Sequence, residues 1–182
     1  MKLANTPHGY GAIAKAFHWA VVALVVAGWA LGTFGEELPR GAGRDLAFFI
    51  HVSTGLLVLA LLLPRIVWRV VDAPPPPEPM PFGRWAERFA AVAHYALYAL
   101  VLAVPLAGIA AQFARGEALP VLGLVTIPSP MTAVRATARS VKEVHEVLAN
   151  ALLILALLHA AAALFHHFVL RDRTLVRMLP GR

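Results

Sequence analysis

The chain has 182 residues, of which 59% are hydrophobic and 14% are charged, and its formal net charge is +6. A soluble domain carries about 25% charged residues, so this chain lacks the polar side chains needed to cover itself in water. The composition excludes a secreted globular domain, a disordered chain and an ordinary cytosolic enzyme. The excess of positive charge indicates membrane topology rather than a nucleic-acid partner, because membrane proteins concentrate Lys and Arg on one side.

Four apolar stretches are long enough to cross the hydrocarbon core, which takes about 20 helical residues. They lie at about 14–34, 46–71, 86–113 and 141–170. The last stretch opens with polar residues, so we expect its helix to start outside the membrane core. The sequence predicts an all-α fold, an integral membrane four-helix bundle that forms a single domain over residues 1–182.

The three connections differ in chemistry. Residues 36–44 contain Pro and Gly and predict a tight turn between antiparallel helices. Residues 73–81 contain six prolines, the last of them Pro81, and indicate a stiff polyproline II spacer. Residues 115–139 are the longest connection, and nothing in them fixes a chemistry.

The distribution of Lys and Arg predicts the orientation. With four spans, both termini and the second connection share one side, which holds ten of the sixteen Lys and Arg residues. The positive-inside rule places this side in the cytoplasm. We therefore expect both termini to be cytoplasmic.

The chain has no cysteine and eight histidines. The lack of cysteine excludes an Fe–S cluster and c-type haem attachment. Ionisable residues inside a membrane mark functional sites. His18 and His159 are expected near the cytoplasmic face, whereas His51 and His145 are expected near the opposite face.

The spacing of two histidines in the fourth stretch predicts two metal levels. His145 and His159 are fourteen residues apart, which is a rise of about 21 Å and nearly four full helical turns. Both imidazoles therefore project from nearly one face at two depths. Pairing by depth, His51 with His145 and His18 with His159, places two imidazoles on either side of an iron porphyrin, and such ligation suits electron transfer. Small residues four positions after three of these histidines leave room for a planar group: Gly55, Ala149 and Ala163.

Two alternatives stay open for these histidines. Each of them can hydrogen-bond a neighbouring helix, and the alanines can serve helix packing. A metal-ion transporter can also use histidine ligands, but it normally needs carboxylates within the membrane. The core of each predicted span lacks Asp and Glu.

Two further histidines, His94 and His166, lie toward the cytoplasmic side. Neutral imidazole near pH 7 suits hydrogen bonding to a quinone carbonyl or proton relay. The alternative is an interfacial position or contact with a haem propionate.

The chain resembles the bacterial di-haem cytochrome b561 family. The matching stretches are residues 17–19, 50–55, 144–150, 158–164, 166–167 and the C-terminal Asp172, Thr174–Leu175 and Arg177–Pro180. The resemblance implies four transmembrane helices in the bacterial inner membrane, with two b haems. Residue by residue, His18 and His159 would be the iron ligands of one haem, and His51 and His145 those of the other.

One branch of the family is the superoxide oxidases, which pass electrons from superoxide to ubiquinone. Ser140 and Lys142 are similar to that branch, whereas Val144 stands where it has an aromatic residue and Glu78 where it tends to have Lys. We expect Arg135, Arg139 and Lys142 to attract superoxide, although ordinary interfacial anchoring is the alternative for these charges. The expected partners are lipid, quinone and superoxide, without an obligatory protein partner. The alternative function is a quinone-linked cytochrome b subunit of a hydrogenase or a dehydrogenase.

Overall fold

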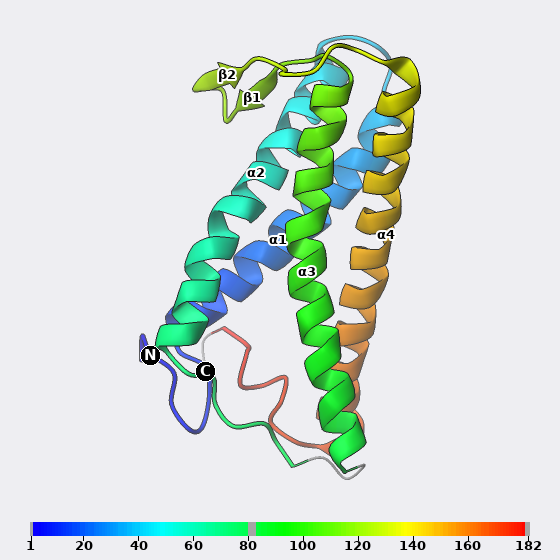
Figure 1. The fold of residues 1–182 in the computed structure, drawn as a ribbon. Helices are drawn as coiled ribbons and strands as arrows, with labels where there is room; N and C mark the ends of the chain where they lie inside the picture. Colours follow the sequence, from blue (N-terminus) through cyan, green and yellow to red (C-terminus); the bar gives the residue numbers. More distant parts are fainter. Residues whose placement is uncertain (1, 80–82, 181–182) are drawn as a thin grey trace.

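Four long helices dominate the structure (Figure 1), a computed structural model that describes residues 2–79 and 83–180. They are α1 Ala12–Phe34, α2 Ala42–Val71, α3 Arg84–Ala114 and α4 Arg135–Phe165. A 3₁₀ turn, Gly35–Glu37, follows α1, and a π-helical turn, His166–Leu170, continues α4. All four helices are long and apolar enough to cross a membrane, which confirms the predicted four-helix membrane bundle.

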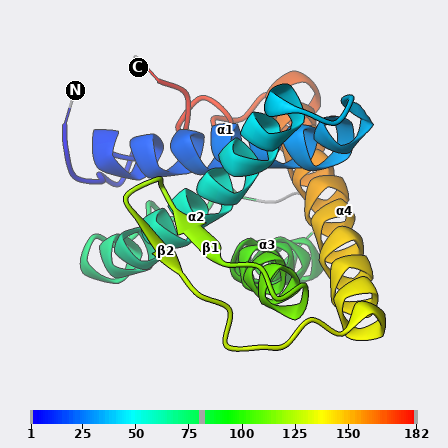
Figure 2. The same cartoon turned by 90° about the horizontal axis from the view of Figure 1, so that it is seen from above.

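The helices pack mainly as two pairs, α1 with α2 and α3 with α4. Viewed from above, α1 runs obliquely to the axis of α3 (Figure 2). Both chain termini lie at one end of the bundle, and the α1–α2 connection and a β-hairpin lie at the other (Figure 1). We call these the terminal end and the hairpin end.

The hairpin consists of β1 Leu119–Val121 and β2 Val125–Ile127, which pair antiparallel. It lies in the longest connection, residues 115–139, for which the sequence made no prediction of strands. Its tip packs on α2, where Gly123 lies close to the ring of Phe49. Its base is held by Gln112, whose side-chain amide donates to the carbonyl of Ala118. The hairpin therefore covers the ends of α2 and α3.

All four helices start before the predicted apolar stretches, α2 and α4 by the most. The structure begins α2 at Ala42 rather than at residue 46, and α4 at Arg135 rather than at residue 141. An apolar stretch marks the part of a helix that lies in lipid, whereas the backbone hydrogen bonds continue through polar turns outside it. The predicted polyproline spacer has no regular hydrogen-bonded structure over residues 73–79, and Pro81 lies outside the described residues.

The terminal end is tied together by hydrogen bonds between distant segments. Arg177 donates to the carbonyls of Pro7, His8 and Pro76 and forms an ion pair with Glu78 at 3.2 Å. The indole of Trp19 donates to the carbonyl of Met178. The C-terminal segment is thereby fixed against the N-terminus and the proline-rich connection.

Candidate functional site

Four histidine rings meet as two pairs at two levels of the bundle. His51 on α2 and His145 on α4 have ring centroids 6.0 Å apart, near the hairpin end. His18 on α1 and His159 on α4 have ring centroids 6.4 Å apart, near the terminal end. We call these the hairpin-end pair and the terminal-end pair. The partners are those that the spacing in the sequence predicts, and α4 contributes one ring to each pair.

Backbone carbonyls orient both rings of the hairpin-end pair. Nδ1 of His51 lies 2.8 Å from the carbonyl oxygen of Gly28, and Nδ1 of His145 lies 2.9 Å from that of Val104. A carbonyl oxygen only accepts, so each Nδ1 must carry the ring proton. Each Nε2 then has a free lone pair, which is the state of imidazole that binds a metal.

Two glycines let these rings approach the neighbouring helices. A Cβ atom on Gly32 of α1 would lie 2.9 Å from Cε1 of His51, and one on Gly108 of α3 would lie 3.1 Å from Cε1 of His145. Each glycine stands four residues after the carbonyl to which the ring donates. The same arrangement therefore seats both rings, one on α1 and the other on α3.

A cavity of about 670 Å³ opens beside the hairpin-end pair and is lined by all four helices. Its volume lies within the range of about 300–1,000 Å³ that is typical of ligand sites. The two histidines lie in its wall, and seven charged residues also line it. These are three cations, Arg44, Arg115 and Lys142, and four carboxylates, Glu36, Asp45, Glu117 and Glu146. Their formal charges sum to −1, so the lining is close to neutral.

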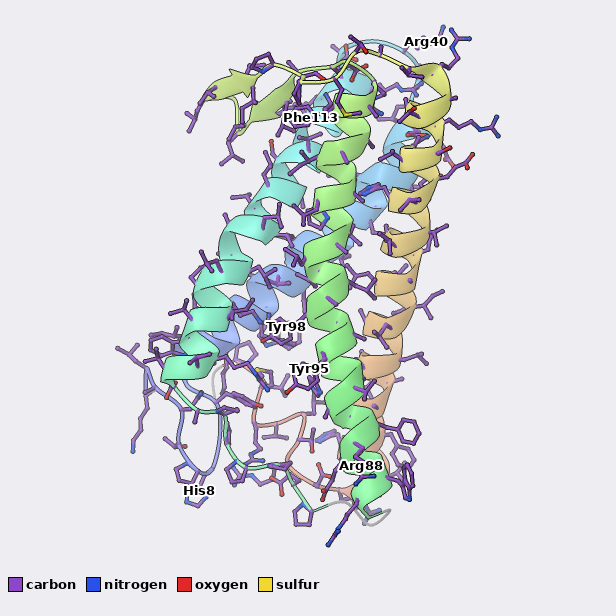
Figure 3. The ribbon with its side chains drawn as sticks, in the orientation of Figure 1. His8, Arg40, Arg88, Tyr95, Tyr98 and Phe113 are labelled. Carbon is purple, nitrogen blue, oxygen red and sulfur yellow. The ribbon has the colours of Figure 1, made fainter. Side chains whose placement is uncertain are left out.

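The terminal-end pair has a different environment, built from side chains. Arg65 of α2 donates to the hydroxyl of Tyr98 at 3.2 Å and to the carbonyl of Phe17 at 3.3 Å. One guanidinium nitrogen of Arg65 also lies 3.4 Å from Nδ1 of His18. Figure 3 shows Tyr98 on the part of α3 that faces α2. A positive charge therefore lies directly beside one ring of this pair.

The two histidines predicted to bind quinone lie in separate surroundings. His94 is close to the terminal-end pair, with its ring centroid 5.1 Å from that of His159, and its Nδ1 contacts the carbonyl of Ala90 at 2.6 Å. His166 instead meets the C-terminal segment, where its Nδ1 lies 2.5 Å from a carboxylate oxygen of Asp172. The structure thus brings His94, but not His166, into ring contact with a paired histidine.

The three residues predicted to attract superoxide differ in position. Only Lys142 lines the cavity, and its ammonium lies 2.8 Å from Glu36 and 3.2 Å from Glu146. Arg139 forms an exposed ion pair with Glu143. Arg135 is exposed in the first turn of α4.

Arg115 was not predicted, although it lines the cavity, and its guanidinium stacks 5.2 Å from the ring of Phe48. It also donates to the side-chain oxygen of Gln112.

A model of the prokaryotic cytochrome b561 family matches residues 9–181 of the chain. The chain belongs to this family. It is 36% identical to cytochrome b561 homolog 2 of Escherichia coli K12, over 98% of this chain and 95% of that protein. It is 35% identical to the "Probable superoxide oxidase CybB" of Yersinia pestis, over 95% of this chain and 97% of that protein. Cytochrome b562 of Cereibacter sphaeroides is 33% identical, over 96% and 97% of the two chains.

These matches make the protein a multi-pass bacterial membrane electron carrier, and cytochrome b561 membership implies b-type haem. The residues present fit such a group. Metal–imidazole bonds of about 2 Å on opposite sides of one ion would separate two ring centroids by about 6 Å, close to the 6.0 and 6.4 Å observed. The 5.1 Å between His94 and His159 is too short for that arrangement. Within residues 2–79 and 83–180, no three His, Cys, Asp or Glu side chains converge on a bare cation site.

Proposed function

We propose that this cytochrome b561 holds two b haems, one between His51 and His145 and one between His18 and His159, and transfers electrons from superoxide to ubiquinone. The observation that carries the proposal is the two ring pairs, with spacings of 6.0 and 6.4 Å, at two levels of one bundle. The ligands on α4 are fourteen residues apart, a rise of about 21 Å. Two redox levels at that separation form a path across much of the bilayer.

The proposed orientation puts the hairpin end in the periplasm and both termini in the cytoplasm of a bacterial inner membrane. It rests on the excess of Lys and Arg at the terminal end. Superoxide would then meet the hairpin-end pair, and the similarity to a probable superoxide oxidase supports this donor.

The reaction needs electron transfer at one end and protons at the other. The haems supply one-electron chemistry. Each superoxide loses one electron and leaves as oxygen, and two electrons with two protons convert ubiquinone to ubiquinol. Lys142 and Arg115 at the cavity would draw the anion inward, with Arg135 and Arg139 at the start of α4 adding positive charge outside it.

His166 and His94 are the proposed quinone contacts at the terminal end. The carboxylate of Asp172 accepts from Nδ1 of His166, so Nε2 of His166 would donate to a quinone carbonyl, and pass it a proton, only when the ring is protonated on both nitrogens. Nδ1 of His94 donates to the carbonyl of Ala90, so its Nε2 would likewise donate to a quinone carbonyl only in the protonated ring. These two rings thus supply the hydrogen-bonding and proton-transfer groups that quinone reduction requires.

The first test is the dithionite-reduced absorbance spectrum of the detergent-purified protein, with haem quantified against protein. We expect two low-spin b haems per chain, and one after either His51→Ala or His18→Ala. No haem after expression with adequate haem supply would refute the cytochrome mechanism. The isolated protein should then reduce ubiquinone in the presence of a superoxide source. Lys142→Gln should slow this rate and weaken its salt dependence, whereas Lys142→Arg should not.

The near-neutral cavity lining favours a second candidate, a quinone-linked electron-carrier subunit of a hydrogenase or dehydrogenase. Three cations and four carboxylates do not concentrate a small anion as a uniformly positive funnel does. Co-purification with a metalloenzyme, together with no superoxide-dependent reduction by the isolated protein, would decide for this candidate.

A further inference from the structure

The two histidine pairs differ in the group that lies next to Nδ1, the ring nitrogen that would not bind the metal. In the hairpin-end pair, both Nδ1 atoms donate to backbone carbonyls, of Gly28 and Val104. In the terminal-end pair, Nδ1 of His18 lies 3.4 Å from the guanidinium of Arg65. The hairpin-end pair therefore has partial negative charge beside both rings, whereas the terminal-end pair has a full positive charge beside the ring of His18.

These contacts have opposite effects on a haem iron. An imidazole that donates to a carbonyl becomes a more basic ligand, which stabilises the oxidised iron and lowers the midpoint potential. A cation beside the ligand opposes the extra positive charge of the oxidised iron and raises the midpoint potential. Hydrogen bonding around axial ligands is an established means by which a protein sets haem potentials.

Arg65 is well placed to keep its charge at the terminal-end pair. Its other hydrogen bonds go to the hydroxyl of Tyr98 and the carbonyl of Phe17, and its guanidinium carbon lies 5.3 Å from the centre of the Tyr98 ring. These partners are neutral, and they hold the guanidinium even when a neutral His18 bound to iron carries its proton on Nδ1. Among the described residues, no carboxylate forms an ion pair with Arg65.

Charged residues farther from the rings also make the terminal end more positive than the hairpin end. A second cation, Arg69, lies 5.9 Å from the centre of the Tyr98 ring. At the hairpin end, the three cations of the cavity are outnumbered by four carboxylates. The positive potential is therefore stronger at the terminal-end pair than at the hairpin-end pair.

We propose that Arg65 raises the midpoint potential of the haem between His18 and His159 above that of the haem between His51 and His145. This inference rests on the two-haem proposal above. With haems bound, this order of potentials would favour electron transfer from the hairpin end to the terminal end, and that transfer would need no proton. Arg65 is a positioning residue that acts through His18, and it gives electron transfer a direction.

The experiment is a spectroelectrochemical titration of the purified holoprotein. The single-haem variants His18→Ala and His51→Ala assign the two midpoints, and we expect the higher midpoint to disappear in His18→Ala. In Arg65→Gln, the higher midpoint should shift downward while the lower one stays in place. Arg65→Lys should restore most of the shift, because it keeps the charge. Arg69→Gln is the matched control on the same helix and should move the higher midpoint less than Arg65→Gln.

Each outcome separates this inference from the two-haem proposal. If the wild-type protein holds no haem, the two-haem proposal fails. If both haems bind but the higher midpoint survives in His18→Ala, the order of potentials is the reverse of that proposed. If Arg65→Gln keeps both haems and neither midpoint moves, Arg65 has no such role. Should Arg65→Gln not fold, Tyr98→Phe removes one anchor of the guanidinium and should lower the same midpoint by less, and an unchanged midpoint there counts against the proposal.

Discussion

The hairpin end and the terminal end each orient two imidazoles, but they do so with different groups. At the hairpin end, helix backbone does so: two carbonyls accept from the rings, and two glycines, Gly32 and Gly108, let the rings approach. At the terminal end, side chains surround the pair, with Arg65 beside His18 and His94 beside His159. The difference teaches that the spacing of the two histidines on α4 sets the two levels, whereas the neighbouring helices set the surroundings of each pair.

The largest effect is expected from variants that prevent the histidine rings of the hairpin-end pair from approaching Gly32 and Gly108. In the double variant Gly32→Ala and Gly108→Ala, each new methyl would lie about 3 Å from a histidine ring, so both rings must shift. We expect the variant to lose about one of two haems, with the terminal-end haem retained in the reduced spectrum. Gly43→Ala is the control, because a Cβ there would meet nothing within 4 Å. Equal haem content in the double variant and the control would contradict the proposed role of the glycines.

The next prediction concerns the tie between distant segments at the terminal end. Arg177→Ala removes three hydrogen bonds to carbonyls and an ion pair from a side chain that is only 10% exposed. We expect a loss of about 2–3 kcal/mol of stability, seen as a lower thermal unfolding midpoint in detergent. Arg173→Ala is the matched control, since Arg173 is exposed in the same segment. If the two variants unfold at the same temperature, the contacts of Arg177 contribute little.

A smaller effect is expected at the hairpin end from Lys142→Gln. The ion pairs of Lys142 with Glu36 and Glu146 have side chains about half exposed, and exposed pairs contribute about 0.2–1 kcal/mol. Thermal unfolding should therefore change by much less than in Arg177→Ala. A destabilisation as large as that of Arg177→Ala would mean that the hairpin end depends on side-chain charges as much as the terminal end does.

The smallest expected effect is a pH dependence at the terminal end. Burial raises the pKa of Asp172, but hydrogen bonds from His166 and Thr174 outweigh burial and hold that pKa below its usual 3.8. A depressed pKa in the folded state contributes stability above the ordinary pKa, and this is lost as pH falls through the folded value. Asp172→Asn should therefore lower the unfolding midpoint at pH 6, and its difference from the wild type should shrink as the pH falls below 3.8. A difference that persists undiminished at pH 3 would contradict this origin.

The sequence was sufficient to predict the helices and the histidine partners. Apolar length alone identified four spans, and the fourteen-residue interval between His145 and His159 predicted two levels on one face. Both inferences depend on helix geometry, which is the same in every helix. The helix ends at Ala42 and Arg135 were missed because polar turns carry no comparable signal.

The supporting contacts could not be predicted, because they join helices whose mutual register is set by packing. Gly32 and Gly108 are two of thirteen glycines, and only the approach of a histidine ring distinguishes them. Arg115 was missed because it ends α3 in an apparently ordinary loop, and the hairpin that follows is only three residues per strand. Arg65 was counted only as a cytoplasmic positive charge, although the structure turns it toward His18.

The presence of one histidine of each pair on the same helix, α4, limits insertions and deletions in that helix. Because α4 supplies one ring to each level, the fourteen-residue interval from His145 to His159 fixes the distance and the relative orientation of the two rings. Inserting or deleting one residue in that stretch would swing one ring by about 100° relative to the other, while a change of a whole turn would keep the face but displace one level by about 5 Å. Relatives that keep both levels should therefore differ in this stretch by substitution and not by insertion or deletion.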